Sequence, residues 1–382
     1  MAKILLVAEN YAFGPIGKLL TIADVLRRRG HKLIFAGFGT SLQMARDYPF
    51  DRIYQVDTEN EKYTDKLSKI MKDVDLLVSS MDIQSVVVAK SLKKPVVYID
   101  CLFWFWEDIQ TVLFDIDIYI RERSINDTKA DQNAKKFGPK IKNLYTVGPI
   151  IPLIKTRRRK KQVVISYGGG EATHWYKVGR DTNYPFVMTN ILLKYVDWTP
   201  FSRIIIATGK HILDDLSKEF VNSPFKFTNC GSHEGFLKEM SKSEILLTTA
   251  GLVTTQEAFY SNTPVIFLPP SNDSHYILLD ELRDQIPNIP SVHLSDFMDK
   301  LILRGKSVED NISNVMKQLH KVEKSESIQA GIGSNINKLL SARATWLKTS
   351  VGNNKLFLDN LGENGAETVV EKIEELFRKQ AE

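Results

Sequence analysis

The chain has 382 residues, of which 43% are hydrophobic, and its formal net charge is +5. A globular chain of this length exceeds one ordinary hydrophobic core, so we expect two domains of similar size. No apolar run reaches the ~20 residues of a membrane-spanning helix. The first residues enter a strand pattern directly and lack the features of a signal peptide, which predicts a cytoplasmic protein.

Cysteine and charge content exclude further classes. Cys101 and Cys230 stand far apart and build no disulfide framework, and no Cys or His cluster has the spacing of metal ligands. We therefore predict no structural zinc site. Residues 157–161 form a basic run that is too short and too poor in aromatic residues to predict nucleic-acid binding. We interpret it as a solvated linker, with contact to an anionic membrane surface as the weaker alternative, and predict no particular oligomeric state.

The first half of the chain alternates short apolar runs with helical patterns. Strands are predicted at residues 4–7, 33–36, 76–79 and 95–99. Such alternation is typical of βαβ units with a parallel sheet. The helix after the first strand has the clearest pattern, because its apolar side chains share one face, residues 27–29 are arginines in its last turn, and Gly30 ends it.

A second series of the same kind follows residues 150–161. Its predicted strands are residues 162–166, 204–207, 225–229, 245–248 and 265–268. We predict Rossmann-like α/β domains at residues 1–155 and 156–362, and an amphipathic C-terminal helix at 363–382 with the first domain as its packing partner. Because ligands of parallel sheets bind at the carboxyl ends of the strands, we expect a ligand cleft where the two domains face one another.

Residues 246–258, followed by 263–270, are the most informative stretch. They read as an apolar strand, a tight turn at Ala250-Gly251, a helix that opens with free hydroxyls and amides, and a second apolar strand that ends in prolines. A helix N-terminus at the end of a parallel strand presents unpaired N–H groups and a partial positive charge, which suit a phosphate. We therefore predict a phosphorylated ligand beside Gly251.

Over nearly its whole length the chain resembles the GT-B glycosyltransferases, nearest to the inverting nucleotide-sugar enzymes that modify small molecules or lipid carriers. The donor-site pattern of that family, His-Gly-Gly-x-x-Ser/Thr-x-x-Glu-Ala, lines up with Thr249, Ala250, Gly251, Thr254, Glu257 and Ala258. The resemblance implies that Gly251 and Thr254 contact the diphosphate and that Glu257 holds the ribose hydroxyls. Thr249 stands where the family often has a histidine, so one phosphate donor is weakened or replaced by a hydroxyl.

Two further loops resemble donor-site loops of the family. Gly168, Gly169 and Gly170 match the other phosphate-side loop, where absent side chains let the backbone approach the leaving group. The family usually offers Asp-Gln to the donor sugar after the second strand. Here residues 271–275 read Ser-Asn-Asp-Ser-His, and we predict Asp273 as the sugar contact, with Asn272 and His275 next. A polar loop that caps the following helix is the alternative interpretation.

The first half resembles the opening of the family's acceptor domain. The matching residues are Gly14, Pro15, Leu20, Ala23, Leu26, Arg29, Gly30 and His31. Pro15 occupies the position of the usual catalytic base, and proline has no side chain that accepts a proton. Either another residue supplies the base, or the acceptor needs little activation, or the chain catalyses no glycosyl transfer.

Candidate bases at the predicted strand ends are Glu9, Asp82 and Glu171, each of which could instead be a surface or capping carboxylate. Three residues are predicted to contact the acceptor, namely Gly14, Trp104 and Trp106, although aromatic residues at strand ends also pack in cores.

The resemblance implies a GT-B enzyme that moves a sugar from a nucleoside-diphosphate sugar to a small-molecule acceptor, with inversion. It implies neither a metal ion nor a cofactor, because the nucleotide-sugar is a substrate. The frequency of each nucleotide in the family makes UDP the first candidate for the donor nucleotide and dTDP the second. Two alternatives remain open: a nucleotide-sugar hydrolase or epimerase of the same fold, and a catalytically silent nucleotide-sugar-binding partner. The missing base at Pro15 keeps the hydrolase or epimerase open, and the lack of a His-Arg-Arg-Glu-Asn-like run disfavours the epimerase.

Overall fold

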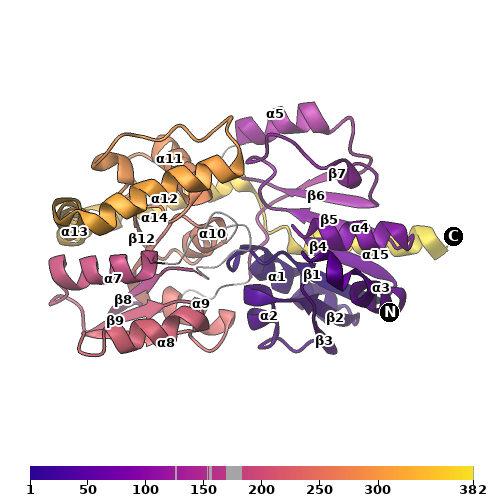
Figure 1. Ribbon diagram of the computed structural model, residues 1–382, viewed down its shortest axis with the longest axis horizontal. Helices are drawn as coiled ribbons and strands as arrows, with labels where there is room; N and C mark the ends of the chain where they lie inside the picture. The colour runs from indigo at the N-terminus through magenta and orange to yellow at the C-terminus, as the bar shows by residue number, and fades with distance from the viewer. Residues whose placement is uncertain (125–126, 153, 155–156, 169–182, 382) are drawn as a thin grey trace. The chain divides into compact units, whose positions relative to one another are not determined.

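The computed structural model describes residues 1–124, 127–152, 154, 157–168 and 183–381. The chain forms two compact units, one of Met1–Pro152 with Asp359–Glu382 and one of Leu153–Leu358. Each unit is built on a parallel β-sheet with helices on both faces (Figure 1). The predicted α/β class with two Rossmann-like units is therefore confirmed.

The sheet of the first unit has seven parallel strands in the order β3-β2-β1-β4-β5-β6-β7. They are β1 (Lys3–Ala8), β2 (Lys32–Gly37), β3 (Arg52–Gln55), β4 (Leu76–Ser80), β5 (Val96–Asp100), β6 (Ile118–Glu122) and β7 (Leu144–Val147). The strand order reverses between β1 and β4, where Ala8 pairs with Ser80 at the carboxyl edge. In open α/β sheets such a reversal creates a crevice for ligands at the carboxyl ends of the strands.

Helices cover both faces of this sheet. They are α1 (Gly14–Arg28), α2 (Gly39–Ala45), α3 (Thr64–Lys72), α4 (Ile83–Ser91), α5 (Asp127–Phe137) and α15 (Ala366–Ala381), with 3-10 turns η1 (Glu61–Tyr63) and η2 (Thr111–Leu113). As predicted, α1 follows the first strand, has arginines in its last turn, and is followed by Gly30 at a φ of +83°. Glycine is favoured there because other residues are strained at positive φ.

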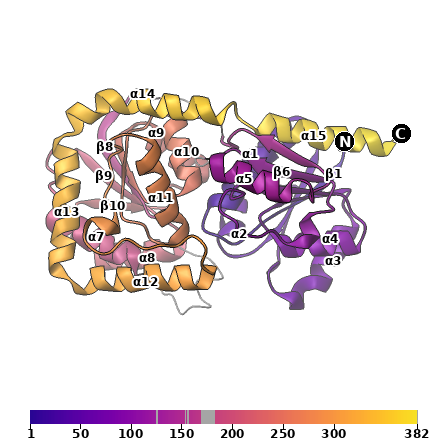
Figure 2. The same cartoon turned by 90° about the horizontal axis from the view of Figure 1, so that it is seen from above.

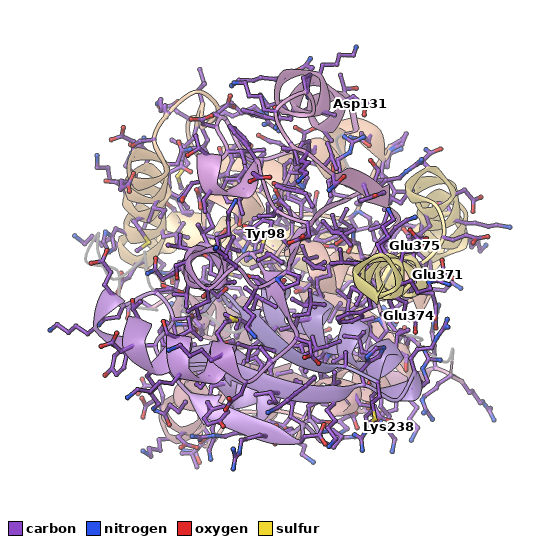
Figure 3. All side chains as sticks on the ribbon, turned by 90° about the vertical axis from the view of Figure 1, so that its right-hand side faces the viewer. Tyr98, Asp131, Lys238, Glu371, Glu374 and Glu375 are labelled. Carbon is purple, nitrogen blue, oxygen red and sulfur yellow. The ribbon has the colours of Figure 1, made fainter. Side chains whose placement is uncertain are left out.

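The C-terminal helix α15 packs on α1 of the first unit (Figure 2). Val369, Val370 and Ile373 are fully buried in the core of that unit. Around them, Glu367 lies 2.7 Å from Arg28, and Glu374, labelled in Figure 3 with its neighbours, lies 3.5 Å from Arg29. Exposed ion pairs contribute at most ~1 kcal/mol each. The buried apolar face therefore accounts for most of the attachment.

Two glycines allow the segment before α15 to cross the end of the first sheet. A Cβ atom on Gly148 would overlap the carbonyl oxygen of Glu363, and one on Gly365 would overlap the carbonyl oxygen of Gly148. The Gly365 amide donates to the Pro149 carbonyl at 3.0 Å, and the Asn364 side-chain amide donates to Ile151. The crossing thus depends on direct contact between two backbones.

The second unit has five parallel strands in the order β10-β9-β8-β11-β12. They are β8 (Lys160–Ser166), β9 (Arg203–Ala207), β10 (Phe225–Thr228), β11 (Ser243–Thr248) and β12 (Val265–Phe267). The order reverses between β8 and β11, where Ser166 pairs with Thr248. Both predicted glycine-bearing loops follow these two strands.

The described helices of the second unit connect its strands and then surround the sheet. They are α7 (Tyr184–Tyr195), α8 (Lys210–Glu219), α9 (His233–Ser241), α10 (Leu252–Tyr260), α11 (Asp273–Gln285), α12 (Val308–Lys324), α13 (Glu326–Ser341) and α14 (Arg343–Leu361), with the 3-10 turn η3 (Leu294–Asp296). Figure 2 shows α12, α13 and α14 following one another around the sheet. Throughout the described part of the chain, every helix is too short or too polar to span a bilayer.

Replacement of Gly148 by Ala tests the backbone crossing. The added Cβ would overlap a backbone oxygen, which cannot rotate away, so we expect a loss of roughly 2–4 kcal/mol in the free energy of unfolding. Chemical denaturation provides the measurement. The matched control is Gly30→Ala, because nothing lies within 4 Å of its Cβ. The control should lose only the ~1–2 kcal/mol of its left-handed backbone, and equal losses in both variants would contradict the crossing.

Candidate functional site

The turn between β11 and α10 lies at the strand-order reversal of the second sheet. Gly251 is the N-cap residue of α10 and, as a glycine, has no side chain that could cap this helix. The first amides of a helix have no acceptor within the helix, and the helix dipole adds positive charge at this end. Thr254 is half-buried in the first turn, while Thr249 and Ala250 are buried beneath it. This arrangement suits an anionic ligand such as a phosphate.

The absent side chain of Gly251 leaves space at the start of α10. Its φ of −77° suits any residue, so glycine is not required for the backbone conformation. A Cβ at this position would lie 3.4 Å from His275 Nε2, the nearest neighbouring atom. The first turn of α11 therefore borders the first turn of α10.

Glu257 lies in the second turn of α10, and its side chain is 1% exposed. Its Oε1 lies 2.7 Å from Nε2 of His233, the first residue of α9. Sequence analysis assigned no role to His233, because nothing in its spacing connects it with a carboxylate 24 residues away. The carboxylate can accept several hydrogen bonds, so this contact is compatible with further binding to hydroxyl groups.

The other predicted donor-site residues lie in the loops after β8 and before α11. Gly168 follows β8 with a φ of +66°, while Gly169, Gly170 and Glu171 lie outside the described residues. Asp273, the first residue of α11, is 2% exposed. A direct sugar contact by Asp273 stays a prediction.

Asn272 caps α11, as the alternative interpretation of this loop expects. Its Oδ1 accepts from the His275 amide and from the Ser274 hydroxyl, both at 2.8 Å. The two donors identify this atom as oxygen and the other as the amide nitrogen Nδ2. Nδ2 is buried and has no hydrogen-bond acceptor among the described residues.

Carboxylates gather at the carboxyl edge of the first sheet. Glu9 follows β1, and Asp82 and Asp100 follow or end β4 and β5, so the reversal of strand order brings them together. Burial raises the pKa of Glu9 to about 8, with further increases from the negative charges of Glu59, Asp82 and Asp100. Glu9 is therefore mostly protonated at neutral pH and titrates in the mildly alkaline range.

Asp82 is the N-cap of α4 and is 2% exposed. Its Oδ1 accepts from the Ser85 amide at 2.7 Å, and its Oδ2 accepts from the Thr58 hydroxyl at 2.5 Å. Burial raises its pKa, while these hydrogen bonds act in the opposite direction. Since both oxygens are engaged, the capping interpretation describes Asp82 well.

Asp100 is a buried site residue that sequence analysis missed. It accepts from Tyr119 at 2.6 Å and from the Trp106 indole at 3.1 Å, and burial raises its pKa to about 6 despite these bonds. Asp100 directly follows the strand predicted at residues 95–99, and this position could have identified it as a site residue. Trp106 is half-buried, whereas Trp104 is 1% exposed and belongs to the core.

Gly14 begins α1 and is half-exposed, and Pro15 is buried in the first turn of the same helix. Pro15 thus leaves the start of α1 without an acid or base at that position. In the described ranges, no group of three or more His, Cys, Asp or Glu residues is arranged to hold a metal ion.

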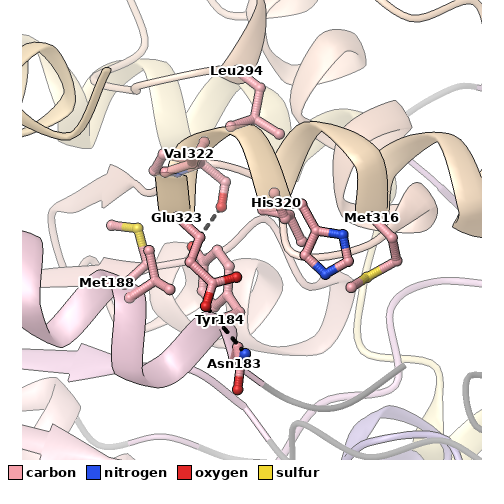
Figure 4. A pocket seen from close by; sticks show the side chains of 11 residues that line it. Asn183, Tyr184, Met188, Leu294, Met316, His320, Val322 and Glu323 are labelled. Atoms are coloured by element: carbon pink, nitrogen blue, oxygen red, sulfur yellow. Dashed lines mark hydrogen bonds between the residues drawn. The ribbon is translucent and has the colours of Figure 1, made fainter. Parts of the chain in front are cut away.

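A small cavity in the second unit lies beside α7, α12 and Pro269 (Figure 4). Its volume of about 20 Å³ suits one water molecule, not a sugar. The Tyr184 hydroxyl donates to the Pro269 carbonyl at 2.5 Å, and Asn183 donates to Glu323 at 3.3 Å. These bonds connect α7 with α12 and with the loop that precedes α11.

No protein-family model and no curated protein sequence matches the chain. Solved structures do match its fold. A variant of Os79 from O. sativa, in complex with UDP, has a TM-score of 0.54 at 11% identity and covers 96% of this chain and 98% of its own. MnaA of S. aureus, also solved with UDP, has a TM-score of 0.51 at 12% identity. The match covers 91% of this chain and 97% of MnaA. The chain therefore has the GT-B fold, as the sequence resemblance predicted.

Replacement of Glu9 by Gln tests the raised pKa of this carboxyl group. The folded-state pKa of about 8 exceeds the ordinary value of 4.5, so Glu9 favours folding at low pH and loses this contribution as the pH rises through 8. Since Gln does not titrate, the Tm of the variant relative to the wild type should be about 2–4 °C higher at pH 9 than at pH 5. The exposed Glu61→Gln control should show no such trend, and a pH-independent difference for Glu9→Gln would contradict the raised pKa.

Proposed function

We propose that the protein is a cytoplasmic glycosyltransferase that moves a sugar from a nucleoside-diphosphate sugar to a small-molecule acceptor, with inversion and without a metal. The observation that carries this proposal is the uncapped N-terminus of α10 beside Gly251, at the strand-order reversal of the second sheet. Backbone amides at this point can stabilise a departing diphosphate. UDP is the first nucleotide to test, because Os79 and MnaA were both solved with UDP, and dTDP is the second.

The second unit would bind the donor. Gly251 and Thr254 would contact the diphosphate, Glu257 the ribose hydroxyls, and Asp273 the sugar. The burial of Glu257 and its contact with His233 support the ribose assignment, because they fix the carboxylate in one place. Thr249, Ala250 and Gly168, with Gly169 and Gly170 beyond the described residues, would line the diphosphate side.

The first unit would bind the acceptor, near Gly14 and the half-buried Trp106. Glu9 is the favoured base, since both oxygens of Asp82 already accept hydrogen bonds. Deprotonated Glu9 would take the proton from the acceptor hydroxyl while the oxygen of that hydroxyl attacks the anomeric carbon. The bond between that carbon and the diphosphate breaks, and the diphosphate leaves with the electron pair. Glu171 remains a further candidate.

A hydrolase is the second candidate function, and Pro15 favours it. A buried proline at the start of α1 supplies no base for an acceptor alcohol, and water would take the place of the acceptor in a hydrolase. Incubation with UDP-sugars and dTDP-sugars, with and without a panel of small-molecule alcohols, separates the functions. Acceptor-dependent release of UDP supports the transferase, release without acceptor the hydrolase, and binding without turnover a silent partner.

The pH profile of transfer tests Glu9 as the base. Because the base must be deprotonated, kcat/KM should rise with pH up to an apparent pKa of about 8. Glu9→Gln should lower kcat at least ~100-fold and leave the affinity for UDP unchanged. The control Asp82→Asn should keep most of the activity. A Glu9→Gln enzyme with wild-type kcat would exclude this role.

Titration calorimetry with UDP tests the ribose assignment of Glu257. Replacement by Ala removes an acceptor of two hydroxyl hydrogen bonds, so the Kd should increase roughly 10–100-fold. Glu234→Ala serves as the control, because Glu234 is exposed in the first turn of the neighbouring α9. An unchanged Kd in the Glu257 variant would remove the assignment.

A further inference from the structure

The loop after β3 crosses the carboxyl edge of the first sheet. β3 is an edge strand, and β2 lies between it and β1. Residues 57–60, here called the β3 loop, nevertheless contact the residues that follow β1 and β4. Glu59 Oε1 accepts from the backbone amide of Asn10 at 3.1 Å, and the Thr58 hydroxyl donates to Asp82 at 2.5 Å. The β3 loop therefore connects both sides of the strand-order reversal.

Asn10, which follows Glu9, is held by further contacts. Its Oδ1 accepts from the Thr40 amide at 2.9 Å and from the Thr40 hydroxyl at 2.8 Å. Gly39 has a φ of +55°, and a Cβ at that position would overlap the Asn10 side chain. On the other side, the amide of Glu9 donates to the Ser80 carbonyl at 3.0 Å. The backbone is thus fixed both at Glu9 and directly after it.

The β3 loop also brings negative charge to the carboxyl group of Glu9. Burial is the largest cause of the raised pKa of Glu9, and the charge of Glu59 is the next largest. Asp82 and Asp100 raise this pKa as well, from the ends of β4 and β5. Glu59 therefore acts on Glu9 more strongly than the other two carboxylates do.

Other titratable groups at this edge add little charge of their own. Burial raises the pKa of Tyr98 and of Cys101, which lie close enough to Glu9 to be influenced by its charge, so both side chains are neutral near pH 8. From α1, Lys18 lies 2.6 Å from Glu122 in a buried ion pair. The carboxylates of the neighbouring loops therefore dominate the electrostatics at Glu9.

We propose that Glu59 is a positioning residue for Glu9: its carboxylate fixes the backbone after the proposed base, and its negative charge sets the pH range in which that base works. This inference rests on the proposed function, in which Glu9 accepts the proton of the acceptor hydroxyl. The two effects are separable by mutation. The hydrogen bond with Asn10 needs only an acceptor oxygen, which Gln also offers, whereas the repulsion of Glu9 needs the negative charge.

The pH profile of sugar transfer by the full-length Glu59→Gln enzyme tests the effect of the charge. Without the negative charge Glu9 loses its proton more readily, so the rise of kcat/KM should move at least about 0.5 pH unit lower. At pH 6 the variant should then be about threefold more active than the wild type. Its kcat at alkaline pH should stay within about twofold of the wild-type value, because the acceptor for the Asn10 amide is retained.

Glu59→Ala removes the acceptor together with the charge. We expect the same displacement of the pH profile, and in addition a kcat at alkaline pH that is roughly 3–10-fold lower, because the backbone after Glu9 is no longer held. The matched control is Glu61→Gln, which removes a negative charge from an exposed residue at the start of η1. The control should leave the profile unchanged.

Thermal unfolding gives a readout that needs no activity. The Tm difference between a Glu9→Gln variant and its parent should increase with pH until Glu9 is deprotonated, which occurs at about pH 8 in the wild-type background. In the Glu59→Gln background the increase should be smaller and should level off at least about 0.5 pH unit lower.

The outcomes separate the inference from the proposed function. A wild type that transfers no sugar, with the expected change in the Tm differences, would overturn the proposed function and leave the coupling of the two carboxyl groups supported. An active wild type whose pH profile or Tm differences are unchanged by Glu59→Gln would overturn the inference alone. Equal losses of kcat/KM at every pH in the Gln and Ala variants would also overturn it, because they would indicate a general disturbance of the loop.

Discussion

The first amides of α10, which have no acceptor within the helix, are the constraint on which the proposed donor site depends. A helix that begins without a side-chain cap leaves hydrogen-bond donors and positive potential at its end. Parallel strands deliver such helix ends to one edge of the sheet, and the reversal between β8 and β11 separates the neighbouring crossover helices there. Gly251 keeps this end open. The same arrangement places His275, from the first turn of α11, beside Gly251.

At the carboxyl edge of its sheet, the first unit has acidic side chains where the second unit has the positive potential of a helix N-terminus. Glu9, Asp82 and Asp100 follow neighbouring strands, and their burial disfavours the charged forms. The surroundings distinguish the three groups. Asp82 and Asp100 accept several hydrogen bonds that stabilise their charge, whereas mutual repulsion adds to the effect of burial at Glu9. Glu9 is thereby left with a pKa of about 8, which is close to the pH at which a general base works well.

Most of the strands that sequence analysis located have nearly continuous apolar runs. β1, β4 and β11 read this way because strands covered by helices on both faces bury every side chain. β3 was missed because this edge strand is half-exposed, and β6 because it ends in Arg121 and Glu122. The phosphate turn at Gly251 could be predicted for a similar reason, since a strand, a glycine and a helix start are all local features.

The sequence by itself determined the α/β class, the GT-B resemblance and the position of the α10 turn. These follow from short-range periodicity and from residue types within a few positions. Only the tertiary structure decided that His233 holds Glu257, that Asp100 joins Glu9, and that His275 borders Gly251. Sheet order and register bring together residues that are many positions apart, and the energy of a buried charge depends on those neighbours more than on its own place in the chain.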